Sequence, residues 1–144
     1  MKQYLKFQIT TGKIILALLF SFLGISSSSA QINKHIDSNQ TILGQWVTHD
    51  GRAVVEIFEE DGSFHGTIVK ILDQEVDSSL IGFLILNDFS IRRKSYVDGS
   101  MHDPEGGGIY KSKLWLENID TLSVRDYCGL FHKTFTWTRY KAKK

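Results

Sequence analysis

Apolar and polar residues alternate along much of the chain with the two-residue period of β-strands. In the clearest segment, two sets of side chains point to opposite sides: Tyr110, Ser112, Leu114 and Leu116 on one, and Lys111, Lys113, Trp115 and Glu117 on the other. Further along the chain, the same pattern puts four apolar residues on one face: Leu122, Val124, Phe135 and Trp137. Strands with one apolar and one polar face are typical of antiparallel sheets that have one side in water.

Pairs of Asp and Gly separate these segments, at Asp50-Gly51, Asp61-Gly62 and Asp98-Gly99. Asp-Gly between apolar segments is a strong β-hairpin signal, because glycine adopts the positive φ angles of tight turns at little cost. Residues 74–80, and Pro104 with the glycines that follow it, are predicted to be loops. The prediction is therefore eight strands, over 44–49, 53–59, 63–72, 82–87, 90–97, 108–117, 121–127 and 131–139.

Short strands joined mostly by tight turns predict an all-β fold, a single small antiparallel up-and-down barrel of about eight strands. Closure of the barrel leaves no free sheet edge that could aggregate. The interior of such a barrel has room for packed side chains or for one small ligand. Because strand-borne aromatic residues usually serve packing, a solid core or a small pocket is favoured over a large cavity.

The first 30 residues have the features of a secretory signal peptide. Three lysines and no acidic residue accompany an apolar run over 14–25, and the small residues Ser28 and Ala30 follow it. This run of twelve residues is short for a membrane span, which needs about 20, so a cleaved signal is favoured over a retained membrane anchor. We therefore predict cleavage after Ala30, and the short, Ser-rich exit indicates bacterial export to the periplasm or the medium.

The predicted mature chain consists of a flexible lead-in, residues 31–43, and a β-barrel domain, residues 44–140, without a transmembrane segment. Losing the three lysines of the leader changes the formal net charge from +1 to −2, with 14 basic and 16 acidic residues left. Nucleic-acid-binding proteins concentrate basic residues on one face, so we expect no nucleic-acid partner. A single cysteine, Cys128, excludes an internal disulfide.

A series of short segments follows the opening Gly44-Gln45-Trp46 in a set order: Val54–Glu59, His65–Asp73, Asp103–Gly106, Tyr110–Glu117, Leu122–Arg125 and Thr136–Arg139. Together they resemble the exported bacterial proteins grouped as domain of unknown function 2147. The resemblance implies a lipocalin-like β-barrel that is exported and has no assigned activity. The chain departs from that family at Arg92-Arg93-Lys94, where Trp and Gly are usual, and at Asp126, where Gly is common.

Lipocalin-like barrels tend to begin with Gly-x-Trp and to cover that Trp with an Arg from the last strand. Gly44, Trp46 and Arg139 match this pattern, so the resemblance implies that they close one end of the barrel. An Arg over the face of a Trp contributes about 0.5–2 kcal/mol. This structural role is favoured over a ligand contact, because the closed end of a small barrel has little volume.

The leading functional hypothesis is that the barrel binds a small apolar or amphipathic ligand, a lipophilic molecule of the cell envelope. The candidate ligand-binding residues belong to the last three predicted strands: Tyr110, Ser112, Arg125, Phe135 and Trp137. An alternative is an envelope accessory protein that contacts an unknown protein partner through Trp115 on the outward face. Enzyme activity is favoured least, since its candidate residues would have to converge on one cleft: Asp103, Glu105, Arg125 and Asp126.

Asp103 and Glu105 lie within three residues of each other, which makes them candidates for cation binding or acid–base chemistry. Asp before Pro is also common in turns, and that interpretation is favoured. The spacing of the five histidines is not typical of a metal site, so we expect no metal and no cofactor. Cys128 with His132 is a candidate nucleophile with its base, but a buried or half-buried structural cysteine is favoured.

Overall fold

The computed structural model of the protein describes residues 41–142. These residues form one short 3-10 helix, η1 (Ser78–Leu80), and nine β-strands: β1 (Gly44–Val47), β2 (Ala53–Glu60), β3 (Ser63–Ile71), β4 (Leu84–Arg92), β5 (Ser95–Val97), β6 (Ser100–His102), β7 (Ile109–Asn118), β8 (Thr121–Cys128) and β9 (Phe131–Arg139). The predicted signal peptide and most of the predicted lead-in fall outside the described residues. Residues 41–142 contain no helix with the length and hydrophobicity that a membrane crossing requires.

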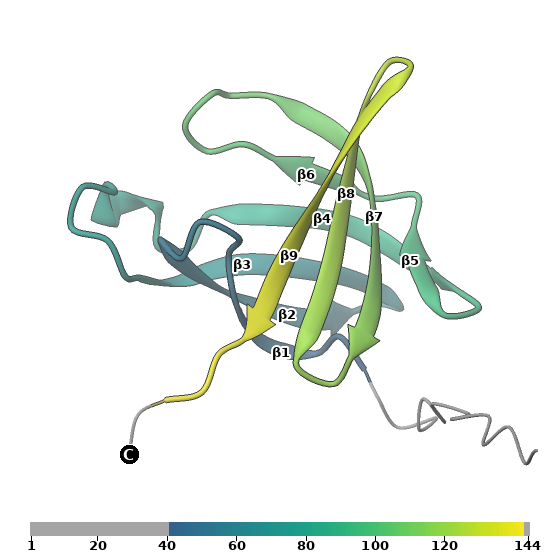
Figure 1. Ribbon diagram of the computed structural model, residues 1–144, viewed down its shortest axis with the longest axis horizontal. Coiled ribbons are helices and arrows are strands. Elements are labelled where there is room, and N and C mark those ends of the chain that lie inside the picture. Colours follow the sequence, from purple (N-terminus) through teal and green to yellow (C-terminus); the bar gives the residue numbers. More distant parts are fainter. Residues whose placement is uncertain (1–40, 143–144) are drawn as a thin grey trace, which may run out of the picture. The chain divides into compact units, whose positions relative to one another are not determined.

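The strands form one antiparallel sheet that closes on itself (Figure 1). Its order is β3-β2-β1-β9-β8-β7-β5-β4-β6, and the additional pairings β3–β4 and β7–β6 complete the ring. β5 and β6 share one position between β4 and β7, because β5 pairs with Ser90–Arg92 and β6 with Leu86–Asn87 of β4. The fold is thus an eight-stranded antiparallel barrel with one extra strand, which confirms the predicted up-and-down barrel.

The strand prediction is wrong between residues 82 and 97. Two strands are predicted there, over 82–87 and 90–97, but β4 continues through the gap between them. Asp88 adopts a left-handed conformation, with φ 58°, and the register against β3 shifts at this point. The chain turns later, at Arg93, with φ 59°. A bulge within one strand and a turn between two strands give the same local sequence signal here, so the sequence pattern did not distinguish them.

Large apolar side chains fill one end of the barrel. Trp46, Phe89 and Leu122 are completely buried there. The burial of Leu114, Leu122, Val124 and Trp137 confirms the inward faces predicted from alternation. Ile42, which belongs to the predicted lead-in, is also completely buried, so packing begins before Gly44.

Arg139 closes this end over Trp46. Its guanidinium carbon lies 4.0 Å from the centre of the Trp46 ring, and burial lowers the pKa of Arg139, an effect that the charge of Asp120 partly opposes. The guanidinium donates hydrogen bonds to three backbone carbonyls, those of Leu43 (3.0 Å), Thr41 (3.2 Å) and Ile119 (2.7 Å). Gly44 has φ 109°, and a Cβ at this position would lie 3.2 Å from Arg139 Nη1. The three predicted barrel-closing residues therefore meet at one end.

Candidate functional site

The opposite end of the barrel contains a partly open cavity of about 540 Å³. The connections β1–β2, β3–β4, β6–β7 and β8–β9 surround it. Its apolar wall includes Ile68, Ile71, Ile85, Met101, Phe135 and Trp137. A concave, mostly apolar site of this volume is typical of small-molecule binding. The sequence favoured a solid core or a small pocket; the closed end is solid and the open end holds this cavity.

The inward side chains differ in size between the two ends. Ala53 on β2 lines the cavity, and its short side chain fills little of the space that it faces. At the closed end, the inward positions carry Trp46 and Phe89 instead. The size of the side chains in each layer of an eight-stranded barrel therefore decides which end is filled and which is open.

Asp126 on β8 is the buried carboxylate of this cavity. It lines the cavity and is 8% exposed. Ser112 Oγ, on the neighbouring strand β7, donates a hydrogen bond to Asp126 Oδ1 at 2.6 Å. Burial raises the pKa of the Asp126 carboxyl, an effect that the Ser112 hydrogen bond and the nearby His49 partly offset. An acidic group at the wall of an apolar cavity gives the site a defined polar contact point.

Aromatic and basic groups lie near this carboxylate at the open end. The ring centres of His49 and Phe135 are 4.3 Å apart. Lys133 is the cross-strand neighbour of Asp126 on β9, yet its Nζ lies 4.7 Å from the centre of the Phe135 ring. Since His49, Lys133 and Phe135 all line the cavity, its mouth combines aromatic surface with titratable groups.

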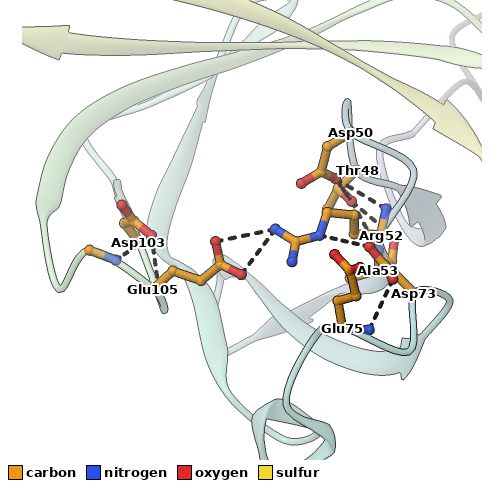
Figure 2. A network of polar contacts seen from close by, with 9 residues as sticks. Thr48, Asp50, Arg52, Ala53, Asp73, Glu75, Asp103 and Glu105 are labelled. Atoms are coloured by element: carbon orange, nitrogen blue, oxygen red, sulfur yellow. Dashed lines mark hydrogen bonds and ion pairs between the residues drawn. The ribbon is translucent and has the colours of Figure 1, made fainter.

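Arg52 links three of the loops that surround the mouth of the cavity (Figure 2). Its Nε lies 3.1 Å from Asp73 Oδ2, after β3, and its Nη1 lies 3.0 Å from Glu105 Oε1, after β6. Within the β1–β2 connection, Asp50 accepts hydrogen bonds from Thr48 Oγ1 (2.6 Å) and from the Arg52 N–H (3.1 Å). Burial raises the pKa of Asp50, but these two hydrogen bonds, together with the charge of His49 and the Asp50 backbone N–H, outweigh it, so the net shift is downward.

The loop after β6 is held by Asp103. Its Oδ1 accepts hydrogen bonds from the backbone N–H groups of Glu105 (2.9 Å) and Gly106 (3.0 Å). The carboxylate therefore shapes the turn, which is the interpretation that the sequence favoured. Glu105, directed by this turn, reaches Arg52 (Figure 2).

We expect Arg52→Gln to loosen the loops at the mouth while the barrel stays folded. Ion pairs that are this exposed contribute little to global stability, but Arg52 restrains two loops at once. Limited digestion with proteinase K should cut residues 72–83 or 103–108 severalfold faster than in the wild type, with cleavage sites read by mass spectrometry. Arg92→Gln, which breaks the exposed Arg92–Asp98 pair (2.9 Å), is the control and should leave these rates unchanged. Equal rates in all three proteins would contradict the restraint.

Residues 44–139 match the model of DUF2147, a family described as uncharacterized proteins conserved in bacteria. The match begins at the first residue of β1 and ends at the last residue of β9. The chain belongs to this family. The resemblance inferred from short segments of the sequence is thus confirmed, and the family itself carries no assigned activity.

Among solved structures, this DUF2147 protein is similar to protein HP1028 from the human pathogen Helicobacter pylori, which is described as belonging to the lipocalin family. The two chains are 21% identical, the match covers 70% of this chain and 84% of that one, and the TM-score is 0.57. This similarity shows a lipocalin-like fold. No curated protein matches the sequence.

The structure brings most of the predicted ligand-binding residues together. Tyr110, Phe135 and Trp137 line the cavity, and Ser112 lies behind its wall, bonded to Asp126. Arg125 does not line it. Its Nε donates to Thr134 Oγ1 at 2.9 Å and its guanidinium carbon lies 5.0 Å from the centre of the Trp115 ring. Arg125 therefore lies on the outer face, as strand alternation requires for the neighbour of an inward Asp126.

The candidates for enzyme activity divide in the same way. Asp103, Glu105 and Asp126 line the cavity, whereas Arg125 faces outward. Asp103 and Glu105 are engaged in the turn and in the Arg52 ion pair. The convergence that the enzyme hypothesis requires is therefore incomplete.

Several cavity residues were not among the sequence candidates, notably His49, Arg52 and Met101. His49, His102 and His132 all line the cavity although they are far apart in the sequence, and only the barrel topology brings them together. Within residues 41–142, no three His, Cys, Asp or Glu side chains are placed to hold a metal ion.

Cys128 also lines the cavity, and the prediction of a buried or half-buried side chain is wrong because the residue is exposed. The cause is its position near the tip of the β8–β9 hairpin, which extends past the other strands (Figure 1). Leu130 and Phe131 at this tip are 99% and 79% exposed. A pattern of alternating residues gives the side of a strand but does not show where the strand leaves the barrel.

Proposed function

We propose that the protein binds a small apolar or amphipathic molecule inside the open end of its barrel. The observation that carries this proposal is the cavity of about 540 Å³ with a mostly apolar wall. The volume lies within the range of small-molecule sites. The closed end supports the same function, because Arg139 covers Trp46 there and the cavity lies at the opposite end.

We place this binding in the cell envelope of a bacterium. The support is the leader pattern of the first 30 residues, with lysines, an apolar run over 14–25 and small residues before Ala30. A protein that carries lipophilic molecules through an aqueous compartment needs an apolar site shielded from water, and a barrel interior supplies one.

The alternative function, a protein contact through Trp115, has weaker support. Trp115 is half-buried, and Lys113 and Arg125 lie 5.7 and 5.0 Å from its ring centre. Its Nε1 donates to Glu117 Oε1 at 2.6 Å. The ring is thus surrounded by groups of the same sheet, which leaves less of it for a partner.

Filling the cavity is expected to abolish ligand binding. In Met101→Trp, a larger ring would occupy the space next to Tyr110, the cross-strand partner of Met101. The full-length protein would be produced in a bacterium, purified without detergent and titrated with the neutral apolar fluorophore N-phenyl-1-naphthylamine. The affinity should fall at least about tenfold, equivalent to about 1.4 kcal/mol.

Lys111→Trp is the matched control, because it adds the same ring at an exposed position of β7. It should bind the fluorophore like the wild type. Native mass spectrometry of the wild type should also show a bound mass that denaturation removes. If the wild type neither enhances the fluorescence nor carries such a mass, the proposed function is wrong.

A further inference from the structure

Only one of the two carboxylate oxygens of Asp126 accepts a hydrogen bond within the described residues. Oδ1 accepts the hydrogen bond from Ser112, and no hydrogen bond or ion pair within residues 41–142 involves Oδ2. Among the described residues, every side-chain nitrogen or oxygen that is fully shielded from solvent has a hydrogen-bond partner. Since Asp126 is 8% exposed and lines the cavity, Oδ2 is the part of the carboxylate accessible from that cavity.

The nearby basic side chains are not bonded to this oxygen. Lys133 faces Asp126 across β8 and β9 but is placed over the Phe135 ring, 4.7 Å from its centre. Arg52 is engaged by Asp73 and Glu105 at the mouth. His49, from the β1–β2 connection, contacts the Phe135 ring and acts on Asp126 only through its charge.

A buried carboxylate without a cationic partner is costly in an apolar environment. A ligand that brings its own cationic hydrogen-bond donor removes this cost, because charge-assisted hydrogen bonds are among the strongest in proteins. The aromatic residues of the same wall, Phe135, Tyr110 and Trp137, also favour a cation over an anion. An anionic ligand would meet the same carboxylate with like charge.

We propose that the cavity selects amphipathic amines, with the ammonium group bound to Asp126 Oδ2 and the apolar part against the wall formed by Ile68, Ile85 and Met101. This inference rests on the proposed function, since it names the class of molecule that the same cavity binds. Asp126 acts as the selecting residue, and Ser112 holds its carboxylate in place.

The test compares three ligands with the same eight-carbon chain: octylamine, 1-octanol and octanoate. Each is titrated calorimetrically into the wild-type protein at pH 7. Octylamine should bind at least about tenfold more tightly than octanol, and octanoate most weakly, since only the amine brings a positive charge to the carboxylate. Octanol binding with no preference for octylamine would overturn the inference and leave the proposed function intact. Absence of binding by all three ligands and by the neutral fluorophore would overturn both.

The Asp126→Asn variant tests whether this residue causes the preference for the amine. Asparagine keeps the shape and an acceptor for Ser112 but removes the charge, so octylamine should lose at least about tenfold in affinity while octanol changes little. Asp120→Asn is the matched control, because it removes a carboxylate that pairs with Lys141 (3.0 Å) near the chain's last strand. An equal loss in both variants would trace the preference to net charge and overturn the assignment.

Thermal unfolding separates this effect from misfolding. Burial raises the pKa of Asp126, so between the unfolded and folded pKa values the folded state binds more protons and this group's contribution to stability falls as pH rises. Charged groups that face Asp126 are Lys133 from β9 and His49 from the β1–β2 connection, while β7 presents Ser112. At pH 7, Asp126→Asn should therefore melt no lower than the wild type. A lower melting temperature combined with loss of octanol binding would show that Asp126 is structural and would overturn its role in selection.

Discussion

Replacing Trp46 by alanine is expected to destabilise the barrel by about 3–5 kcal/mol, the range found when a buried large aromatic side chain is truncated. The side chain is completely buried, its Nε1 donates to the Ile42 carbonyl at 2.7 Å, and its ring lies 4.0 Å from the guanidinium carbon of Arg139. Alanine leaves a void, an unpaired carbonyl and an arginine without its aromatic surface. Urea denaturation followed by circular dichroism measures the loss.

Trp115→Ala is the matched control, since it removes the same side chain from the outer face. Trp115 is half-buried and its cationic neighbours lie 5.0 and 5.7 Å from the ring centre, so a loss of only about 1 kcal/mol is expected. Trp46→Phe keeps a ring beneath Arg139 and should retain most of the stability if Trp46→Ala fails to fold. Similar losses for Trp46→Ala and Trp115→Ala would contradict the role of Trp46 as the plug of the closed end.

The fold was predictable because its main signals are local. Alternation along β7, β8 and β9 gives the inward faces directly, and Leu114, Val124 and Trp137 are buried as expected. The Gly44-x-Trp46 opening and Arg139 belong to the same recognisable pattern, and they meet at one end of the barrel. Where the local signal was ambiguous, at Asp88, the sequence pattern missed a bulge and divided one strand into two.

The site was predictable only in part. Tyr110, Phe135 and Trp137 line the cavity because they lie on inward faces, which alternation reveals. The choice of Arg125 was inconsistent with the same alternation, which turns Arg125 outward and Asp126 inward. Consistent use of that pattern would have placed Asp126, which was named only as an enzyme candidate, among the ligand-binding residues.

Other features of the site depend on contacts between distant segments. Arg52 reaches Asp73 and Glu105, which lie in two other connections, and no spacing in the sequence indicates this arrangement. The cavity itself is lined by residues from several strands and connections. Their meeting follows from strand register, which a pattern of apolar and polar positions does not determine.

The two ends of the barrel have complementary roles. Trp46, Phe89 and Arg139 form a closed end in which large side chains and backbone carbonyls leave little freedom. The open end has small inward side chains and loops joined by exposed ion pairs, which are weak and readily exchanged. We infer that stability is concentrated at the closed end and that the open end is adapted to admit a molecule.

Gly99 links the closed and the open end of the barrel. Gly99→Ala is expected to destabilise the protein by about 3 kcal/mol or more, which is the top of the range found for overpacked interiors. A Cβ at this buried position would clash with the Phe89 ring and would lie 2.7 Å from the Asn87 carbonyl oxygen. Because one of these atoms belongs to the backbone of β4, a side-chain rotation cannot relieve both contacts. Urea denaturation measures the change.

Gly66→Ala is the control, because its Cβ would meet only the Leu86 side chain among its nearest atoms, at 2.9–3.1 Å, and a loss nearer 1 kcal/mol is expected. The larger effect at Gly99 should also reach the cavity, since the Gly99 carbonyl accepts the Ser112 N–H at 3.0 Å and Ser112 holds Asp126. If Gly99→Ala folds at all, octylamine should bind it more weakly than it binds Gly66→Ala. Gly99→Ala with the stability of Gly66→Ala would mean that β5 and β6 can shift freely away from Phe89, and the connection between the packed end and the carboxylate of the cavity would not exist.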